Sequence, residues 1–325
     1  MKRLMVIAVA PVVVMISATS ATWVYEGQWG TKGSGEGQFY YPNDVDVPRA
    51  EHVYITDGSN HRVQYFTPSR TYIWGTQGSG NGEFNATRGI AVSDDDIVYV
   101  VDGLNQRVQY FTRTGKFLGK WGSPGTGNGQ FIGPTGIAVA PNGNVYVAAA
   151  ADATGSNHRI QYFTPSGSFL GKWGSLGTGD GEFDRPHGIC VAPNGIVYVV
   201  DNHNYRIQYF ASSGSFLGKW GLQGTGDGQF VYPIGIAIAA NGDVFVTDTG
   251  NSRVQHFTPT GSFLGKFGSY GTGNGEFERP SGIAVSPDGT RVYVVDSGNH
   301  RVQYFKEAPT NVVPSSLGRV KALFR

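Results

Sequence analysis

One motif occurs six times along the chain and constrains its fold more than any other feature. It reads Asn-x-Arg-(Val/Ile)-Gln-(Tyr/His)-Phe, and its arginines follow one another at steps of 45, 52, 47, 47 and 48 residues. A period of roughly 40 to 50 residues is typical of β-propeller blades, because one four-stranded sheet cannot bury both of its faces alone. The motif arginines are Arg62, Arg107, Arg159, Arg206, Arg253 and Arg301.

The repeat predicts an all-β protein, a six-bladed β-propeller of four-stranded antiparallel blades over residues 22–306. The third copy illustrates the expected blade, with strand-forming segments at 134–140, 145–147, 159–163 and 168–173 that are rich in β-branched and aromatic residues. Pro, Asn and Gly mark the turns between these strands. A glycine-rich connector, 174–183, leads into the next copy.

These segments resemble the blades of NHL-repeat propellers, which read much like Pro-x-Gly-Ile-Ala-Val, Val-Tyr-Val-x-Asp, Asn-x-Arg-Val-Gln-x-Phe and Gly-x-Phe. The resemblance covers residues 23–305. NHL propellers serve as extracellular sensor domains of receptor kinases and as interaction modules elsewhere, so the resemblance implies recognition more than chemistry.

The two ends of the repeat predict how the ring closes. Residues 23–30 match the fourth strand of a blade, such as 216–221, whereas the last copy ends with its third strand at 301–305. We expect the N-terminal strand to complete the last blade, because this pairing removes exposed sheet edges.

The N-terminus has the order of a secretory signal peptide over residues 1–21. Lys2 and Arg3 precede a 13-residue apolar run, 4–16, and small residues follow it. An uncleaved anchor is the alternative, and either places the protein outside the cell or in the cell envelope. A single cysteine, Cys190, excludes an intramolecular disulfide framework. We expect residues 307–325 to form a flexible tail and the protein to be a monomer.

Each motif arginine except one follows an aspartate placed five residues earlier. A guanidinium and a carboxylate at the same place in each blade most simply form a structural pair. The aspartates are Asp57, Asp102, Asp201, Asp248 and Asp296. Blade three has Ala149 instead and carries an insertion within 148–155, which is either a binding loop or a tolerated surface insertion.

Three histidines share one repeat position, directly before the motif arginine: His61, His158 and His300. Because equivalent positions in different blades lie too far apart for the ~2.1 Å bonds of a zinc site, we interpret them as separate surface histidines.

The position after the residue that opens each inner strand is the leading ligand-binding hypothesis, because only the axis brings six blades within reach of one small molecule. Its occupants differ between blades: Asn43, Arg88, Thr135, His187, Ile234 and Ser281. The similar peptidyl-hydroxyglycine amidating lyases place zinc-binding histidines at such positions in several blades. Only His187 is present here, so the sequence predicts no metal and no cofactor, and no catalytic set is recognisable.

Three functions follow as hypotheses. The first is a non-catalytic binding scaffold that recognises a protein, peptide or glycan. The second is a metal-assisted lyase or lactonase that uses His187 in the channel. The third is RNA binding, as in the tripartite-motif NHL proteins. The last is disfavoured by the export signal and by 25 Lys and Arg against 24 Asp and Glu.

Overall fold

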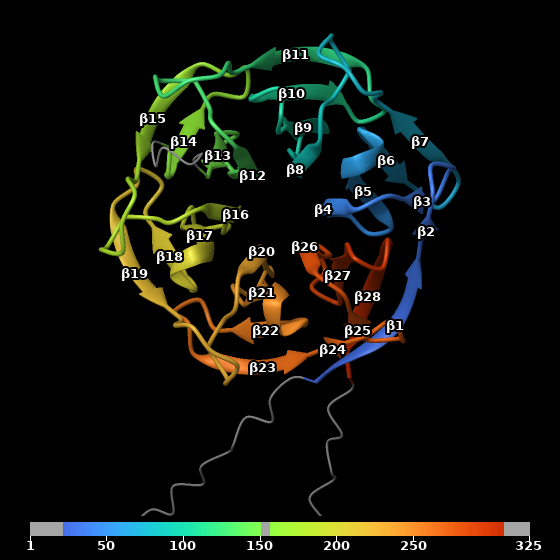
Figure 1. Cartoon of the computed structure of the whole chain (residues 1–325), viewed down its shortest axis with the longest axis vertical. Helices are drawn as coiled ribbons and strands as arrows, with labels where there is room; N and C mark the ends of the chain where they lie inside the picture. Colours follow the sequence, from blue (N-terminus) through green and yellow to red (C-terminus); the bar gives the residue numbers. More distant parts are fainter. Residues whose placement is uncertain (1–21, 151–156, 309–325) are drawn as a thin grey trace, which may run out of the picture.

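A computed structural model of the chain describes residues 22–150 and 157–308. Within these residues, six four-stranded antiparallel sheets stand as blades around a central axis (Figure 1). The prediction of an all-β, six-bladed propeller is confirmed. The proposed signal peptide (1–21), most of the blade-three insertion (151–156) and most of the C-terminal tail (309–325) lie outside the described residues.

Each blade runs from an inner strand at the axis to an outer strand at the rim. The inner strands are β4 (Pro42–Arg49), β8 (Thr87–Val92), β12 (Pro134–Val139), β16 (Pro186–Val191), β20 (Pro233–Ile238) and β26 (Pro280–Val285). The second strands are β5 (His52–Asp57), β9 (Ile97–Asp102), β13 (Val145–Ala149), β17 (Val197–Asp201), β21 (Val244–Asp248) and β27 (Arg291–Asp296).

The motif forms the third strand of every blade. The third strands are β6 (Arg62–Phe66), β10 (Arg107–Thr112), β14 (Arg159–Phe163), β18 (Arg206–Phe210), β22 (Arg253–Phe257) and β28 (Arg301–Glu307). The outer strands are β7 (Thr71–Trp74), β11 (Phe117–Trp121), β15 (Phe169–Trp173), β19 (Phe216–Trp220), β23 (Phe263–Phe267) and, from the N-terminus, β1 (Trp23–Trp29).

Short elements complete the described chain. Three 3-10 turns join second to third strands: η1 (Gly58–Asn60), η2 (Asn202–Asn204) and η3 (Thr249–Asn251). Two glycine-rich connectors form small parallel ladders, β2 (Thr31–Lys32) with β3 (Gln38–Phe39) and β24 (Ser269–Tyr270) with β25 (Glu276–Phe277).

The core lies between neighbouring blades, because each sheet buries one face against the next. The second strands are nearly all buried, as in the Val-Tyr-Val-Val-Asp segment of β17. Each connector also inserts one phenylalanine between two blades. In the second junction Phe131 is completely buried with Val101 of one blade and Val147 of the next. Burying such a ring contributes about 1.5–3 kcal/mol, so the repeated Phe of the connector fastens adjacent blades together.

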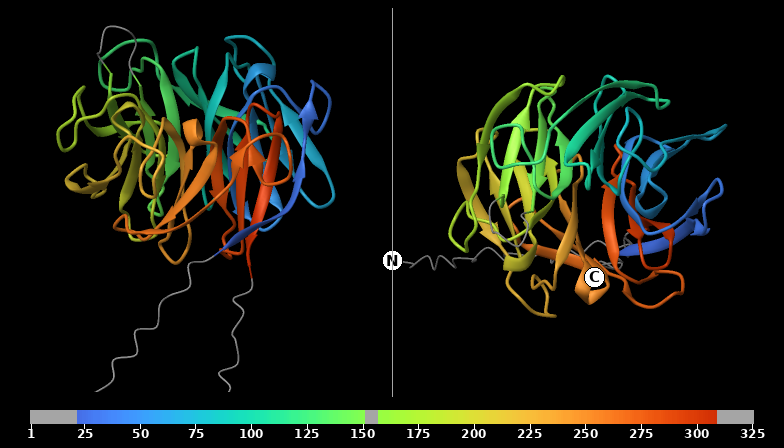
Figure 2. Two further views of the ribbon diagram at one scale, coloured as in Figure 1. Left: turned by 60° about the horizontal axis from the view of Figure 1, so that its bottom comes forward. Right: turned by 45° about the horizontal axis from the view of Figure 1, so that its top comes forward.

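The two ends of the described chain meet in one sheet. Strand β1 pairs antiparallel with β28, from Trp23 opposite Glu307 to Trp29 opposite Val302, and completes the order β1-β28-β27-β26. The side chain of Glu26 adds an ion pair with Arg291 at 2.6 Å. Figure 2 shows the blue N-terminal strand lying beside the red C-terminal one. The predicted ring closure is confirmed.

Candidate functional site

The inner strands enclose a central channel with a cavity at the end where these strands begin. A cavity of about 620 Å³, called here the entrance cavity, is lined by the first residues of the inner strands and by the ends of the second strands. Further along the same strands lies a smaller cavity of about 210 Å³, which Asp44 and Asp46 border. This region is called here the waist. The entrance cavity, with its volume and its several polar groups, has the usual form of a small-molecule site.

All six residues that the sequence singled out at the inner-strand entry line the entrance cavity: Asn43, Arg88, Thr135, His187, Ile234 and Ser281. They are called here the entrance ring. The structure brings them together around one space, and it also gives several of them a partner that sequence comparison does not reveal.

Four members of the entrance ring bind the next blade. Each donates a side-chain hydrogen bond to a backbone carbonyl of the neighbouring inner strand, and such a bond to a buried carbonyl stabilises the junction. The pairs are Asn43 Nδ2 to Thr87 O (2.6 Å), Arg88 Nη1 to Pro134 O (3.0 Å), Thr135 Oγ1 to Pro186 O (3.0 Å) and Ser281 Oγ to Asn43 O (2.8 Å).

The remaining two junctions take their donor from another position. Asn202 Nδ2 donates to Pro233 O at 2.6 Å, and Thr249 Oγ1 donates to Pro280 O at 2.7 Å. Both residues come directly after the last residue of a second strand. In these two blades the entrance-ring residues, His187 and Ile234, are therefore not needed to hold the junction.

His187 and Arg88 are the members of the entrance ring best suited to a ligand. Among the described residues, the His187 side chain makes no hydrogen bond. Burial, together with the charge of Arg88, lowers the pKa of His187 to about 4, so its imidazole is neutral at pH 7. Burial also lowers the pKa of Arg88, and no carboxylate within the described residues forms an ion pair with its guanidinium.

Two carboxylates of the waist were missed by sequence reasoning. Asp44 occupies the position at which every other inner strand has glycine, and Asp46 the position at which they have alanine or cysteine. Asp44 accepts the N–H of Ile90 in the next blade (3.1 Å), and Asp46 accepts that of Val92 (2.7 Å). Burial raises the pKa of Asp44 to about 7 and that of Asp46 to about 6. Aligning the first copy position by position would have revealed both.

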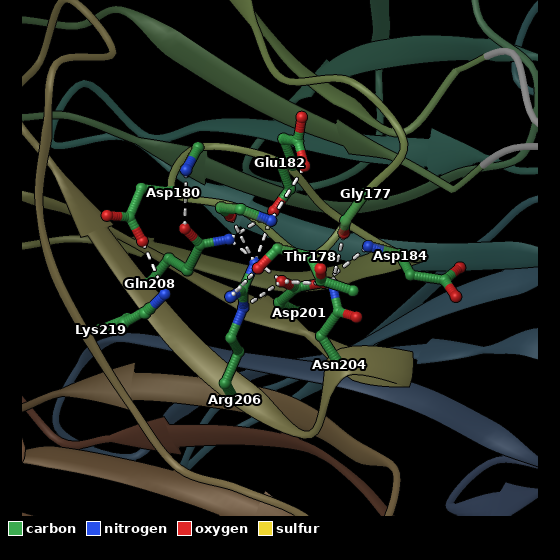
Figure 3. A network of polar contacts seen from close by, with 12 residues as sticks. Gly177, Thr178, Asp180, Glu182, Asp184, Asp201, Asn204, Arg206, Gln208 and Lys219 are labelled. Atoms are coloured by element: carbon green, nitrogen blue, oxygen red, sulfur yellow. Dashed lines mark hydrogen bonds and ion pairs between the residues drawn. The ribbon is translucent and has the colours of Figure 1, made fainter.

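The Asp–Arg pairs lie outside the channel and hold the connectors. In blade four, Arg206 Nε donates to Asp201 (2.7 Å), and its other nitrogens donate to the carbonyls of Thr178, Gly179 and Glu182 (Figure 3). The same carboxylate accepts a hydrogen bond from Gln208 (3.0 Å). Asn204 Nδ2 donates to Gly177 O of the connector at 2.8 Å (Figure 3). The three side chains thus join the strand turn to the glycine-rich connector, which explains why the motif contains Asn, Arg and Gln together.

Comparison with known families agrees with this geometry. The model of the NHL repeat matches residues 183–210, 230–257 and 277–305, each from a connector phenylalanine to the phenylalanine that ends the motif. The chain contains NHL repeats and folds as a six-bladed β-propeller. A search of curated protein sequences gave no significant match.

Solved structures share the fold at low sequence identity. Virginiamycin B lyase from Staphylococcus aureus is 14% identical with a TM-score of 0.57, over 89% of this chain and 99% of that one. A gluconolactonase from Xanthomonas campestris is 14% identical with a TM-score of 0.62, over 90% and 99%. A protein of unknown function from Bacteroides thetaiotaomicron reaches 0.66 at 14% identity, over 88% and 76%. Such identities show the propeller fold alone.

Blade three of the propeller departs from the motif. Ala149 lies opposite Arg159 in the register where the other blades place an aspartate. Within the described residues, Arg159 Nε and Asn157 Oδ1 are buried without a hydrogen-bond partner. The chain leaves the described part at Ala150, which lines the entrance cavity, so the predicted binding role of the insertion stays a prediction.

The three motif histidines hold blade junctions. His158 Nδ1 accepts the backbone N–H of Arg185 (2.8 Å), and His300 Nδ1 accepts that of Tyr41 (3.1 Å). His61 makes the same contact with Ala86 at 3.0 Å. His158 and His300 are only 5% and 8% exposed, so their interpretation as surface histidines was wrong. The inner-strand entry of the next blade covers them.

The described residues contain no group of three His, Cys, Asp or Glu side chains able to hold a metal ion. His187 and Asp44 both line the entrance cavity, but no third ligand joins them within residues 22–150 and 157–308. In the same part of the chain, no helix is long and apolar enough to cross a membrane.

Proposed function

We propose that this NHL propeller is a non-catalytic binding scaffold that holds an anionic group in the entrance cavity. The observation that carries the proposal is Arg88, whose half-buried guanidinium lines the cavity at the axis without an ion-pair partner among the described residues. A buried charge without a counter-charge is costly. A bound carboxylate, phosphate or sulfate would supply that counter-charge and make up to two charge-assisted hydrogen bonds to the fork of Arg88.

The surroundings of Arg88 support an anion. Arg185 and Arg279 are exposed and line the same cavity, and neither forms an ion pair within the described residues. The neutral imidazole of His187 adds one donor and one acceptor without a charge. With a formal net charge of only +1 for the whole chain, three arginines at one cavity are a local concentration of positive charge.

The ligand is an anionic group presented by a protein, a peptide or a glycan outside the cell or in its envelope. The compartment rests on the signal peptide predicted over residues 1–21, and the recognition role on the NHL resemblance. Nucleic acid is not expected, because the charge elsewhere on the chain is balanced.

A thermal-shift screen tests the proposal. Purified protein is heated at low salt with acetate, citrate, phosphate, sulfate and galacturonate, and we expect at least one of them to raise the melting temperature of the wild type. Arg88→Gln should abolish that response. Arg113→Gln should preserve it, because Arg113 is a half-exposed arginine in the turn between β10 and β11 and does not line the cavity. No response in the wild type, or an equal response in Arg88→Gln, would contradict the proposal.

A control addresses the insertion of blade three. Asp152 is an acidic residue of that insertion, outside the described residues. A response that appears only in Asp152→Asn would also count against the proposal, because the chain itself would then neutralise the cavity.

A second candidate is an enzyme that acts at the same cavity, with Asp44 as general base. It is favoured by the place of Asp44 in the wall of the entrance cavity, where burial raises its pKa to about 7, a value that suits proton abstraction at neutral pH. Solved structures of similar fold include a lyase and a gluconolactonase. The test is turnover of a streptogramin B antibiotic and of gluconolactone, with and without a divalent metal. Turnover lost in Asp44→Gly and His187→Ala would support the enzyme, and no turnover by the wild type would exclude these reactions.

A further inference from the structure

The residue directly before each inner strand sits on the rim of the channel in a left-handed backbone conformation. Its φ lies between 47° and 61° in every blade: Tyr41, Ala86, Gly133, Arg185, Tyr232 and Arg279. Residues with a Cβ pay free energy in this region and glycine does not. Gly133 shows that glycine can occupy the position in this protein.

Large side chains nevertheless occupy three consecutive rim positions that line the entrance cavity. They are Arg185, Tyr232 and Arg279, from blades four, five and six, and are called here the rim arc. The rim positions of blades two and three hold only Ala86 and Gly133. The left-handed backbone is common to all six rim positions, so the rim arc differs from blades two and three in the size and polarity of its side chains.

Tyr232 is held in place but stays accessible. Its ring lies 5.3 Å from that of Tyr205 and 5.5 Å, edge to face, from that of His203. The residue is still 47% exposed. A fixed aromatic ring with an open side offers a flat platform, whose negative π face attracts the weakly positive C–H groups of a sugar ring.

The wall below the rim arc is polar. Asn43, Asn202, Thr249 and Ser297 contribute amides and hydroxyls to the entrance cavity, and Ile234 is its one large aliphatic side chain among the described residues. Asn43, Asn202 and Thr249 each donate one hydrogen bond to a neighbouring inner strand, and their side-chain oxygens can still accept hydrogen bonds from the hydroxyl groups of a ligand. The wall offers few contacts to the apolar side chains that anchor peptides and proteins.

We infer that the entrance cavity binds an acidic oligosaccharide, with a sugar ring stacked on Tyr232 and its carboxylates held by Arg185 and Arg279. This inference rests on the proposed function and specifies its ligand class. Arg185 and Arg279 stand in the blades on either side of Tyr232, so cationic groups flank the platform. Each arginine can bind a carboxylate through two parallel hydrogen bonds.

Titration calorimetry at low salt tests the inference, with trigalacturonate, neutral maltotriose, hexaglutamate and inorganic phosphate as probes. We expect trigalacturonate to bind and maltotriose to bind at least roughly tenfold more weakly, because it lacks the carboxylates. Tyr232→Ala should weaken trigalacturonate binding roughly tenfold, and Tyr232→Phe should restore it. Arg279→Gln should weaken it by a similar factor and reduce its salt dependence.

Tyr41→Ala is the matched control. Tyr41 holds the same left-handed rim position in blade one and packs on His300 at 4.7 Å, but it is not part of the cavity wall. Its loss should leave the affinity within twofold of the wild type, while affecting folding as Tyr232→Ala does. An equal loss of affinity in both variants would overturn the role of Tyr232 as a platform.

Two further outcomes overturn the inference while sparing the proposed function. One is binding of phosphate that depends on Arg88 without binding of trigalacturonate. The other is hexaglutamate binding as tightly as trigalacturonate with no effect of Tyr232→Ala. Failure of all four probes to bind would contradict both.

Discussion

Asn202 donates a hydrogen bond to the carbonyl oxygen of Pro233 at 2.6 Å and thereby does in blade four what the entrance ring does in blades one, two, three and six. Removing this donor would leave a buried carbonyl unpaired. Asn202→Ala should therefore lower the free energy of unfolding by about 1–3 kcal/mol, measured by urea denaturation.

His187→Ala is the counterpart of that measurement, because His187 faces the same junction without bonding to it. Its effect on stability should stay below about 1 kcal/mol. If His187→Ala destabilised the protein as much as Asn202→Ala, it would be wrong to assign the junction to Asn202 and to leave His187 available for a ligand.

Blade three offers a gain-of-stability test of the Asp–Arg pair. Ala149→Asp should place a carboxylate in register with Arg159, as Asp102 lies opposite Arg107. The substitution would give Arg159 Nε the partner that it lacks. We expect an increase of about 1–2 kcal/mol in the free energy of unfolding.

The reverse change supplies the control. Asp102→Asn leaves Arg107 buried with no counter-charge and should cost about 3 kcal/mol. A destabilising Ala149→Asp combined with a neutral Asp102→Asn would show that the pairs do not hold the connectors.

Deletion of residues 22–30 tests ring closure. It removes β1, exposes the edge of β28 and breaks the ion pair between Glu26 and Arg291. We expect loss of soluble monomer in size-exclusion chromatography, since an open strand edge promotes association. A monomeric variant with an unchanged melting temperature would refute this account of closure.

The waist predicts a specific pH dependence. The folded-state pKa of Asp44 is about 7, above its ordinary value of 3.8, so the folded protein binds the extra proton between these values. The stability linked to Asp44 is thus present below about pH 4 and lost as the pH rises through 7. Replacing Asp44 with glycine, as in the other blades, removes this dependence. Relative to wild type, Asp44→Gly should gain about 4 kcal/mol between pH 4 and pH 8.

Urea denaturation of both proteins at several pH values measures this difference directly. The buried histidines do not obscure it, because His158 and His300 are the same in both proteins. Their pKa values are lowered by burial, so their own contribution weakens stability as the pH falls below about 6.5. A stability difference that is flat from pH 4 to pH 8 would mean that Asp44 does not titrate in this range.

The sequence predicted the fold because the same physical demands recur in every blade. Arg206 and its equivalents recur at nearly constant spacing, which predicts the six blades. The segment around Trp29 matches the fourth strand of a blade, which predicts how the ring closes. The position of the channel followed too, since inner-strand entries must converge on the axis.

The details of the site could not be predicted in the same way. Asn202, 15 residues after His187, donates the hydrogen bond to Pro233 that holds this junction, and only the folded backbone shows that the two residues border the same junction. The burial of His158 has the same origin, because the covering segment at Arg185 belongs to the next blade. Asp44 and Asp46 also stand out in the sequence, but they lie one and three residues after Asn43, the position at which the blades differ most visibly.

The most direct test of anion binding at Arg88 is anomalous diffraction from crystals soaked in selenate, a tetrahedral dianion with a strong selenium signal. We predict a selenium peak in the entrance cavity with selenate oxygens within hydrogen-bond distance, about 2.7–3.2 Å, of the Arg88 guanidinium. The peak should be absent from Arg88→Gln crystals soaked in the same way. A wild-type cavity without selenium, or an unchanged peak in Arg88→Gln, would contradict the account.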